Sequence, residues 1–221
     1  MKILNAAIIG CGNIGAGFDS PRTRTILTHA HAYTAHPGFK LVGFVDKDYK
    51  KALHAARKWN SKAYRTINDL FLAQDVDVIS VATTTTSHYT VMREITKYQI
   101  VGGIVEKPVA GILRQTLDLA QLNFFKTKPF LVNYSRRYVP EFRTLKENIA
   151  CGRYGAFLCG NGYYGKGLIN NGSHLIDLLL YIGFTTHHIV SQPPHFFDYK
   201  KNDPSRSFTI TVNNKKLVSI Y

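Results

Sequence analysis

The stretch that most constrains the fold lies near the start of the sequence, where an apolar run leads into three spaced glycines. Residues 4–15 read LNAAIIGCGNIG and place Gly10, Gly12 and Gly15 in a G-x-G-x-x-G pattern. In this pattern the first glycine allows a tight strand-to-helix turn, and the second lets a pyrophosphate approach bare backbone. The third lets the helix pack close to its strand, and the first N–H groups of that helix bind the phosphates. The stretch predicts a dinucleotide site, with an ordinary glycine turn as the alternative.

The next predicted strand ends in an acidic residue. Residues 40–45 form a buried-strand pattern that Asp46 follows. A carboxylate at this position accepts hydrogen bonds from the adenosine ribose hydroxyls. The interval from Gly15 exceeds the usual spacing of about 20 residues, and an insertion at residues 17–28, rich in Gly, Pro and Ser, accounts for the excess. Asp46 favours NAD, whereas the neighbouring Lys47 would tolerate the 2′-phosphate of NADP.

Strands and helices alternate through the first part of the chain. Further strands are predicted at 63–64, 76–82, 103–105 and 129–133, and helices at 28–33, 50–58, 67–74, 88–98 and 113–125. This alternation predicts an α/β fold, a Rossmann-type doubly wound parallel sheet at residues 1–130. Ligands bind beyond the carboxyl ends of such strands. The glycine motif, Asp46, residues 83–86 and Lys107 all fall there, so we expect them to converge.

A second domain is predicted at residues 131–221, where the elements no longer alternate. A helix at 140–149 precedes a strand at 156–164, a loop at 165–172 and a helix at 173–182 that Ser173 would cap. Two more strands, 208–212 and 216–221, would be joined by a turn at Asn213 and Asn214. These elements predict an α+β domain.

Composition and charge limit the kinds of partner and the compartment that we expect for this protein. The net charge is +14, but the basic residues are scattered, which favours a basic solvated surface; a phosphate-bearing substrate or a polyanion-binding module is the alternative. Cys11, Cys151 and Cys159 have no metal-like spacing and suit a reducing cytoplasm. We therefore expect a cytoplasmic protein that has no metal, no membrane segment and no nucleic-acid partner.

Three further motifs carry a family resemblance. Glu106-Lys107-Pro108 follows a predicted strand, Arg136-Arg137-Tyr138 lies beyond it, and residues 172–177 read GSHLID. With the glycine motif, they make the whole chain resemble the glucose–fructose oxidoreductase, inositol dehydrogenase and rhizopine-catabolism (Gfo/Idh/MocA) family.

The resemblance implies a second domain with a mostly antiparallel sheet that often mediates oligomerisation. It also implies hydride transfer between NAD(P) and a hydroxyl carbon of a sugar or nucleotide sugar. The cofactor would be bound by Gly10, Gly12, Asn13, Ile14, Gly15, Asp46, Thr83, Thr84, His88, Glu106 and Lys107. The substrate would be bound by Arg137, Tyr138, Asn171 and His174, and the catalytic groups would be Lys107, His174 and Asp177.

The chain departs from the family pattern in three ways. Thr84 stands where many members have proline, and Tyr181 stands where many have histidine. Family members are also substantially longer, so we expect a C-terminally shortened second domain and a doubtful oligomer face. A catalytically inactive NAD-binding protein is therefore the alternative to an enzyme.

Each chemical role has a structural alternative. Lys107, partly desolvated, would accept a hydroxyl proton, or would simply pair with Glu106. His174 and Asp177 share a helix face and would form an acid/base pair, or the aspartate would only fix the helix packing. Asn170 and Asn171 are either loop-turn residues or hydrogen-bond donors to sugar hydroxyls. His29 and His31 are expected to be packing or surface histidines.

Overall fold

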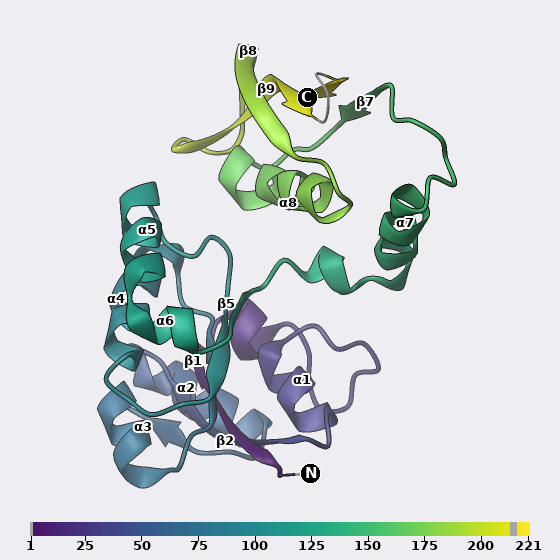
Figure 1. Cartoon of the computed structure of the whole chain (residues 1–221). Helices are drawn as coiled ribbons and strands as arrows, with labels where there is room; N and C mark the ends of the chain where they lie inside the picture. The colour runs from purple at the N-terminus through teal and green to yellow at the C-terminus, as the bar shows by residue number, and fades with distance from the viewer. Residues whose placement is uncertain (1, 213–215) are drawn as a thin grey trace. The chain divides into compact units, whose positions relative to one another are not determined.

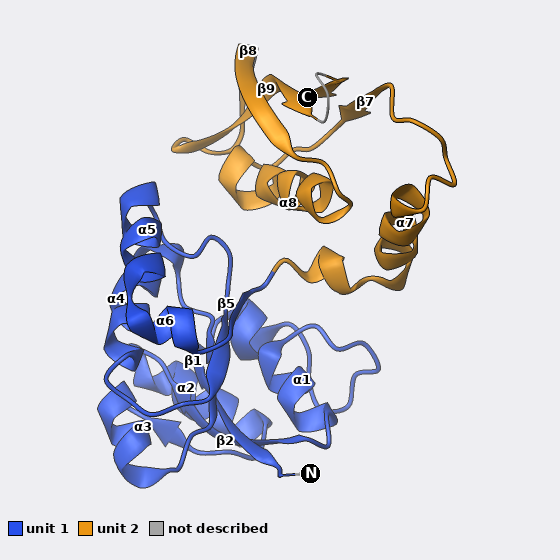
Figure 2. Cartoon of the chain, in the orientation of Figure 1, with its two compact units in different colours: residues 1–133 blue, residues 134–221 orange. Residues whose placement is uncertain are grey.

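The computed structural model describes residues 2–212 and 216–221. The chain divides into two compact units, Met1–Asn133 and Tyr134–Tyr221 (Figure 2). The predicted domain boundary at 130/131 falls within β6 (Phe130–Val132), the last strand of the first unit.

The first unit is built on a six-stranded parallel sheet in the order β3-β2-β1-β4-β5-β6. Its other strands are β1 (Leu4–Ile9), β2 (Phe39–Val45), β3 (Ala63–Tyr64), β4 (Val78–Val81) and β5 (Gly102–Val105). This is the Rossmann strand order, which confirms the predicted sheet. The order reverses between β1 and β4, which opens a crevice at the carboxyl ends of the strands.

Helices cover both faces of this sheet (Figure 1). They are α1 (His29–Ala35), α2 (Tyr49–Lys58), α3 (Ile67–Ala73), α4 (Thr85–Ile95), α5 (Leu113–Gln121) and α6 (Asn123–Thr127). Alternate residues of β1 enter different cores: Ala7 and Ile9 pack in one, Ala6 and Ile8 in the other. A strand that is apolar on both faces must be covered on both sides, which is why the run reads as continuously apolar.

Two predicted helices differ in the structure. The segment that follows Gly12 forms a single π-helical turn, Asn13–Gly17, and the described residues 2–28 contain no α-helix. The helix predicted at 113–125 is two helices, because Leu122 has an extended backbone (φ −67°, ψ 130°) that ends α5 and begins α6. The hydrophobic pattern continues through Leu122 and therefore conceals the break.

The second unit contains a four-stranded sheet in the order β7-β10-β9-β8. Its elements are a 3₁₀ turn (Ser135–Tyr138), α7 (Pro140–Ala150), β7 (Cys159–Gly162), a π-helical turn (Leu168–Gly172), α8 (Ser173–Tyr181), β8 (Thr186–Lys200), β9 (Asp203–Val212) and β10 (Lys216–Ile220). β9 is antiparallel to both β8 and β10, while β10 and β7 are parallel, so the expected mostly antiparallel sheet is present. The inward residues of β9 pack in one core with the apolar residues of α8.

Several predictions for this unit need correction. The strand β8 was not predicted, because its sequence has prolines at 193 and 194 and most of its residues are exposed. Prolines are tolerated there because β8 is an edge strand. Ser173 does not cap α8: it follows the π-helical turn directly, and its hydroxyl donates to the carbonyl of Ile169 at 2.7 Å. The predicted turn at Asn213 and Asn214 lies outside the described residues.

Candidate cofactor and substrate sites

A cavity of about 630 Å³ lies at the carboxyl edge of the parallel sheet, within the first unit. It is lined by residues that follow β1, β2 and β4 and by residues of the adjoining loops and helices. Of the residues predicted to bind the cofactor, its lining includes Gly10, Gly12, Asn13, Ile14, Asp46, Thr83 and Thr84. Gly15, His88, Glu106 and Lys107 are not lining residues.

The glycine turn has the shape that a diphosphate needs. Gly10 has φ +104°, and a Cβ there would lie 2.5 Å from the backbone of Ala82. A Cβ on Gly15 would collide with the carbonyl of Gly10, so Gly15 serves close packing. A Cβ on Gly12 would meet no atom within 4 Å, which leaves the backbone at Gly12 open to a ligand.

Asp46 joins the ends of β1 and β2. Its carboxylate accepts the N–H of Cys11 at 2.8 Å and the N–H of Asp48 at 2.9 Å. Burial and the neighbouring Asp46 raise the pKa of the Cys11 thiol to about 12, so this cysteine in the glycine motif remains a thiol. Lys47, Lys51 and Arg65 line the same cavity and bring positive charge to it.

His88 lies beneath the cofactor loop and does not line the cavity. Its side chain is buried (1% exposed), with Nδ1 2.7 Å from the carbonyl oxygen of Pro108 and Nε2 3.1 Å from that of Thr83. It therefore bridges the loop that follows β4 and the turn that follows β5. The structure thus gives His88 a supporting role beneath the loop, and its contact with the cofactor stays a prediction.

Glu106 is held by a partly buried network that the sequence did not reveal. Its carboxylate lies 2.9 Å from Nε2 of His29 and accepts a 2.6 Å hydrogen bond from Asn133. Burial raises the pKa of Glu106, but the hydrogen bonds from His29 and Asn133, with the charges of His29 and Lys107, outweigh it and hold the pKa below its usual value. His29 is therefore a hydrogen-bond partner of Glu106 as well as a packing residue.

Lys107 follows β5 at the same carboxyl edge as the glycine turn, because β5 is parallel to β4 and β1. It lies close enough to Glu106 for its charge to lower the pKa of that carboxyl. The structure therefore places Lys107 beside Glu106, and its role in the chemistry stays a prediction.

In the second unit, Arg137 and Asp177 form a two-pronged ion pair. Nε and Nη2 of Arg137 donate to the carboxylate at 2.5–3.1 Å, and Asp177 is buried. Hydrogen bonding to Asp177 raises the pKa of Arg137. The sequence paired Asp177 with His174, but Arg137 is the partner in the structure, so this carboxylate is already committed to a guanidinium. Tyr181 contacts the same pair, with its ring 5.7 Å from the guanidinium carbon.

Of the remaining predicted substrate residues, Asn171 and His174 lie at the start of α8, and Tyr138 ends the 3₁₀ turn. The ring of His174 lies edge-on to Tyr134, with centroids 5.5 Å apart. Asn171 donates from its side chain to the carbonyl of Gly165 at 3.0 Å, which makes it at least a loop-fixing residue. Tyr138 is 60% exposed and has its ring available to a ligand.

The geometry of the first unit agrees with a known family. A family model for Gfo/Idh/MocA proteins, described as an oxidoreductase family with an NAD-binding Rossmann fold, matches residues 4–134. The chain belongs to this family. The predicted family and NAD-binding fold are therefore confirmed.

Individual relatives extend the comparison. The chain is 29% identical over 149 residues to the protein YceM of Salmonella typhimurium, to which an oxidoreductase activity is ascribed; this covers 67% of the chain and 44% of YceM. Myo-inositol dehydrogenase from Lactobacillus casei, solved with NAD(H) and myo-inositol, has a TM-score of 0.75 at 20% identity, over 99% of this chain and 66% of that one. The transcriptional regulator Gal80p from Kluyveromyces lactis has a TM-score of 0.79 at 19% identity, over 100% of this chain and 63% of that one.

The described residues also bear on two other classes of site. Among them, no helix combines the length and apolar content needed to cross a membrane. Nor do three or more His, Cys, Asp or Glu side chains gather anywhere in residues 2–212 and 216–221 in a way that could hold a metal ion.

Proposed function

We propose that the protein is an NAD(P)-dependent oxidoreductase that moves a hydride between the nicotinamide and a hydroxyl-bearing carbon of a sugar, cyclitol or nucleotide sugar. The observation that carries this proposal is the cavity at the carboxyl edge of the parallel sheet. The glycine turn, Asp46 and the threonine loop line that cavity, and Lys107 follows a strand that ends at the same edge.

In this proposal the first unit binds the cofactor. The open backbone at Gly12 takes the diphosphate, Asp46 takes the adenosine ribose, and Thr83 and Thr84 border the nicotinamide half. When bound, the oxidised nicotinamide accepts a hydride from the substrate carbon. Lys47, Lys51 and Arg65 offset the charge of Asp46 and make NADP a second possible cofactor.

Residues of this chain would manage the accompanying proton. Lys107 takes the proton of the substrate hydroxyl as the carbonyl forms, and returns it in the reverse direction. His174 is the other titratable group proposed to take part in this transfer. Asp177 fixes Arg137, and Arg137, Tyr138 and Asn171 offer donors and an aromatic surface to sugar hydroxyls.

Cofactor binding and turnover test the proposal separately. Titration with NADH should quench the emission of Trp59 or enhance that of NADH, and absence of any nicotinamide binding would refute the proposal. Turnover should then be sought with NAD or NADP and a panel of free sugars, myo-inositol and UDP-sugars.

The decisive variant is Lys107→Ala. We expect it to lower kcat by at least about a hundredfold, the usual contribution of a positioned acid or base. Lys97→Ala is the matched control, since Lys97 is an exposed lysine at the end of α4. Equal activity of the two variants would exclude Lys107 from the chemistry.

An NAD-binding protein without catalysis is the second candidate. The observation that favours it is the commitment of Asp177 to Arg137, which leaves one fewer free base in the second unit. NADH binding without turnover on the whole panel, unchanged by Lys107→Ala, would support this candidate over the enzyme.

A further inference from the structure

The phosphate-binding turn of this protein lacks the long helix that usually continues from it. Only the five residues Asn13–Gly17 form the π-helical turn, and the inserted segment separates them from α1. A short turn makes few hydrogen bonds of its own, so its geometry depends on what holds its carbonyl end.

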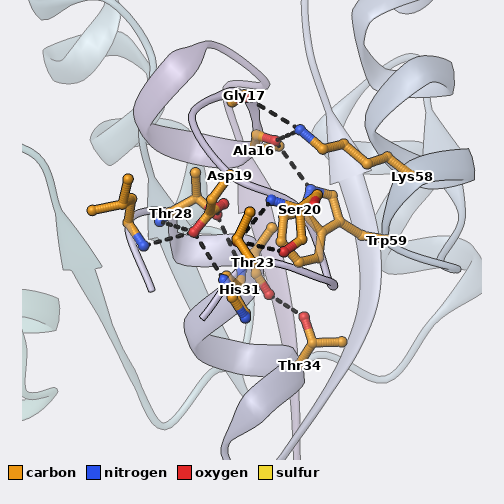
Figure 3. Close-up of polar contacts among 12 residues, drawn as sticks. Ala16, Gly17, Asp19, Ser20, Thr23, Thr28, His31, Thr34, Lys58 and Trp59 are labelled. Carbon is orange, nitrogen blue, oxygen red and sulfur yellow. Dashed lines mark hydrogen bonds and ion pairs between the residues drawn. The ribbon is translucent and has the colours of Figure 1, made fainter. Parts of the chain in front are cut away.

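Two side chains at the end of α2 bind the carbonyl groups at the end of this turn (Figure 3). The ammonium of Lys58 donates to the carbonyls of Ala16 at 3.0 Å and Gly17 at 3.2 Å. The indole N–H of Trp59 donates to the same Ala16 carbonyl at 3.1 Å. Trp59 is 2% exposed, so the anchor is a fixed part of the core.

The inserted segment is tied to this anchor. Asp19 accepts hydrogen bonds from the N–H groups of Leu27 and Thr28 and lies 2.9 Å from Nδ1 of His31. The ring of His31 packs on Trp59, with centroids 5.4 Å apart. Burial raises the pKa of Asp19, but hydrogen bonds from Thr28, Leu27 and His31 outweigh it and hold the pKa below its usual value.

The anchored carbonyls adjoin residues that face the cavity. Asn13 and Ile14 of the same turn line it, and so does Phe18, which directly follows Gly17 and is 60% exposed. A shift of the Ala16 and Gly17 carbonyls would therefore move both the N–H groups of the turn and the aromatic ring of Phe18.

We propose that Lys58 and Trp59 are positioning residues for the cofactor diphosphate, replacing by side-chain hydrogen bonds the support that a continuous helix gives elsewhere. This role rests on the proposed function. Lys58 bears a charge, and hydrogen bonds from charged donors are stronger than neutral ones, so Lys58 is the larger contributor. The two residues share one acceptor, Ala16, so their effects are coupled.

The test compares Lys58→Met with Lys62→Met by isothermal titration of the full chain with NADH, ADP-ribose and adenosine. Lys62 is a nearby exposed lysine, so its substitution removes the same charge without touching the anchor. NADH and ADP-ribose both carry the diphosphate, so we expect Lys58→Met to lower the affinity for each by roughly tenfold. The affinity for adenosine should stay within twofold of the wild-type value. Lys62→Met should bind all three like the wild type.

Trp59→Phe keeps an aromatic ring beside His31 and removes the indole donor, together with part of the buried side-chain volume. It should lower the affinity for NADH severalfold. In the double variant with Lys58→Met, its effect should be smaller than in the wild type, because the two residues donate to the same carbonyl. It also serves as the independent variant if Lys58→Met fails to fold, as judged by circular dichroism. Affinities for NADH within twofold of the Lys62→Met control in both variants would overturn the proposal, as would an equal loss for adenosine. A wild-type chain that binds no NADH would refute the proposed function and this inference together.

Discussion

At the scale of single residues, the buried polar groups of the first unit form a chain of hydrogen bonds that ends at Glu106. An ionised Glu106 only accepts, so Nε2 of His29 carries the proton that lies between them. In a neutral imidazole, Nδ1 then accepts from the hydroxyl of Ser80 at 3.1 Å, and Ser80 accepts from Tyr33 at 2.8 Å. Asn133 completes the chain by donating to the same carboxylate oxygen, Oε1, that faces His29. This network fixes the residue that precedes Lys107.

Replacing His29 tests this network. His29→Phe fills a similar volume but leaves the half-buried Glu106 without its imidazole partner, so we expect the free energy of unfolding to fall by about 1–3 kcal/mol. His29→Gln keeps a donor and should lose less. Urea denaturation followed by the fluorescence of Trp59, the sole tryptophan of the chain, reports on the first unit. Equal stability of His29→Phe and wild type would contradict the network.

The pH dependence of this effect has a definite sign. The folded pKa of Glu106 lies below its unfolded value of 4.5. The ionised form therefore stabilises the fold above pH 4.5, and this stabilisation is lost as the pH falls through the folded pKa. The stability difference between wild type and His29→Phe should shrink on acidification, and a difference that grows towards low pH would refute this assignment.

At the scale of elements, the β8–β9 hairpin supports the loop that leads into α8. Asp203 at the start of β9 accepts the N–H groups of Ile169 at 2.8 Å and Asn170 at 2.9 Å, which begin the π-helical turn. Asp198 accepts the N–H of Lys166 at 2.7 Å. A strand far along the chain thus orders the loop that contains the proposed substrate residues.

Removal of this cap should loosen the loop. In Asp203→Ala we expect the amides of Ile169 and Asn170 to exchange hydrogen about tenfold faster, the equivalent of a lost helix cap. Asp203→Asn, which retains one acceptor, should lie between it and the wild type. Asp198→Ala is the control, since it should affect Lys166 more than Ile169. Unchanged exchange in Asp203→Ala would show that the hairpin does not order the loop.

At the scale of the whole molecule, each unit has an apolar core of its own. Two clusters on opposite faces of the parallel sheet stabilise the first unit, and a third, between α8 and the inner face of the second sheet, stabilises the second. All the residues that line the cofactor cavity belong to the first unit.

The first unit should therefore work by itself as a cofactor-binding domain. We expect a fragment of residues 1–133 to fold, as judged by circular dichroism, and to bind NADH within about threefold of the full chain, a change below about 0.7 kcal/mol. Catalysis should be absent from this fragment. A folded fragment that fails to bind NADH, when the full chain binds it, would show that the second unit contributes to the cofactor site.

Local pattern was enough to predict most of the first unit. The glycine motif, the Asp46 strand end and the β–α alternation depend on residues close in sequence, and the Rossmann sheet and its cofactor edge followed from them. The family followed from the glycine motif together with the short motifs at residues 106–108, 136–138 and 172–177. Prediction failed where the cause was distant or irregular. The strand β8 was missed because it is an edge strand whose sequence contains two prolines. The helix break at Leu122 was missed because the apolar pattern of the sequence continues through it.

By itself, the sequence determined the alternation of strands and helices in the first unit, the glycine turn and the residue types at the cofactor edge, because backbone sterics and hydrophobic periodicity act over short intervals. Only the tertiary structure decided which polar groups meet. It paired Arg137 with Asp177, placed His29 on Glu106, and brought Lys58 and Trp59 to the glycine turn. These contacts join residues that lie dozens of positions apart, and burial, which makes an unpaired polar group costly, selects their partners only once the chain has folded.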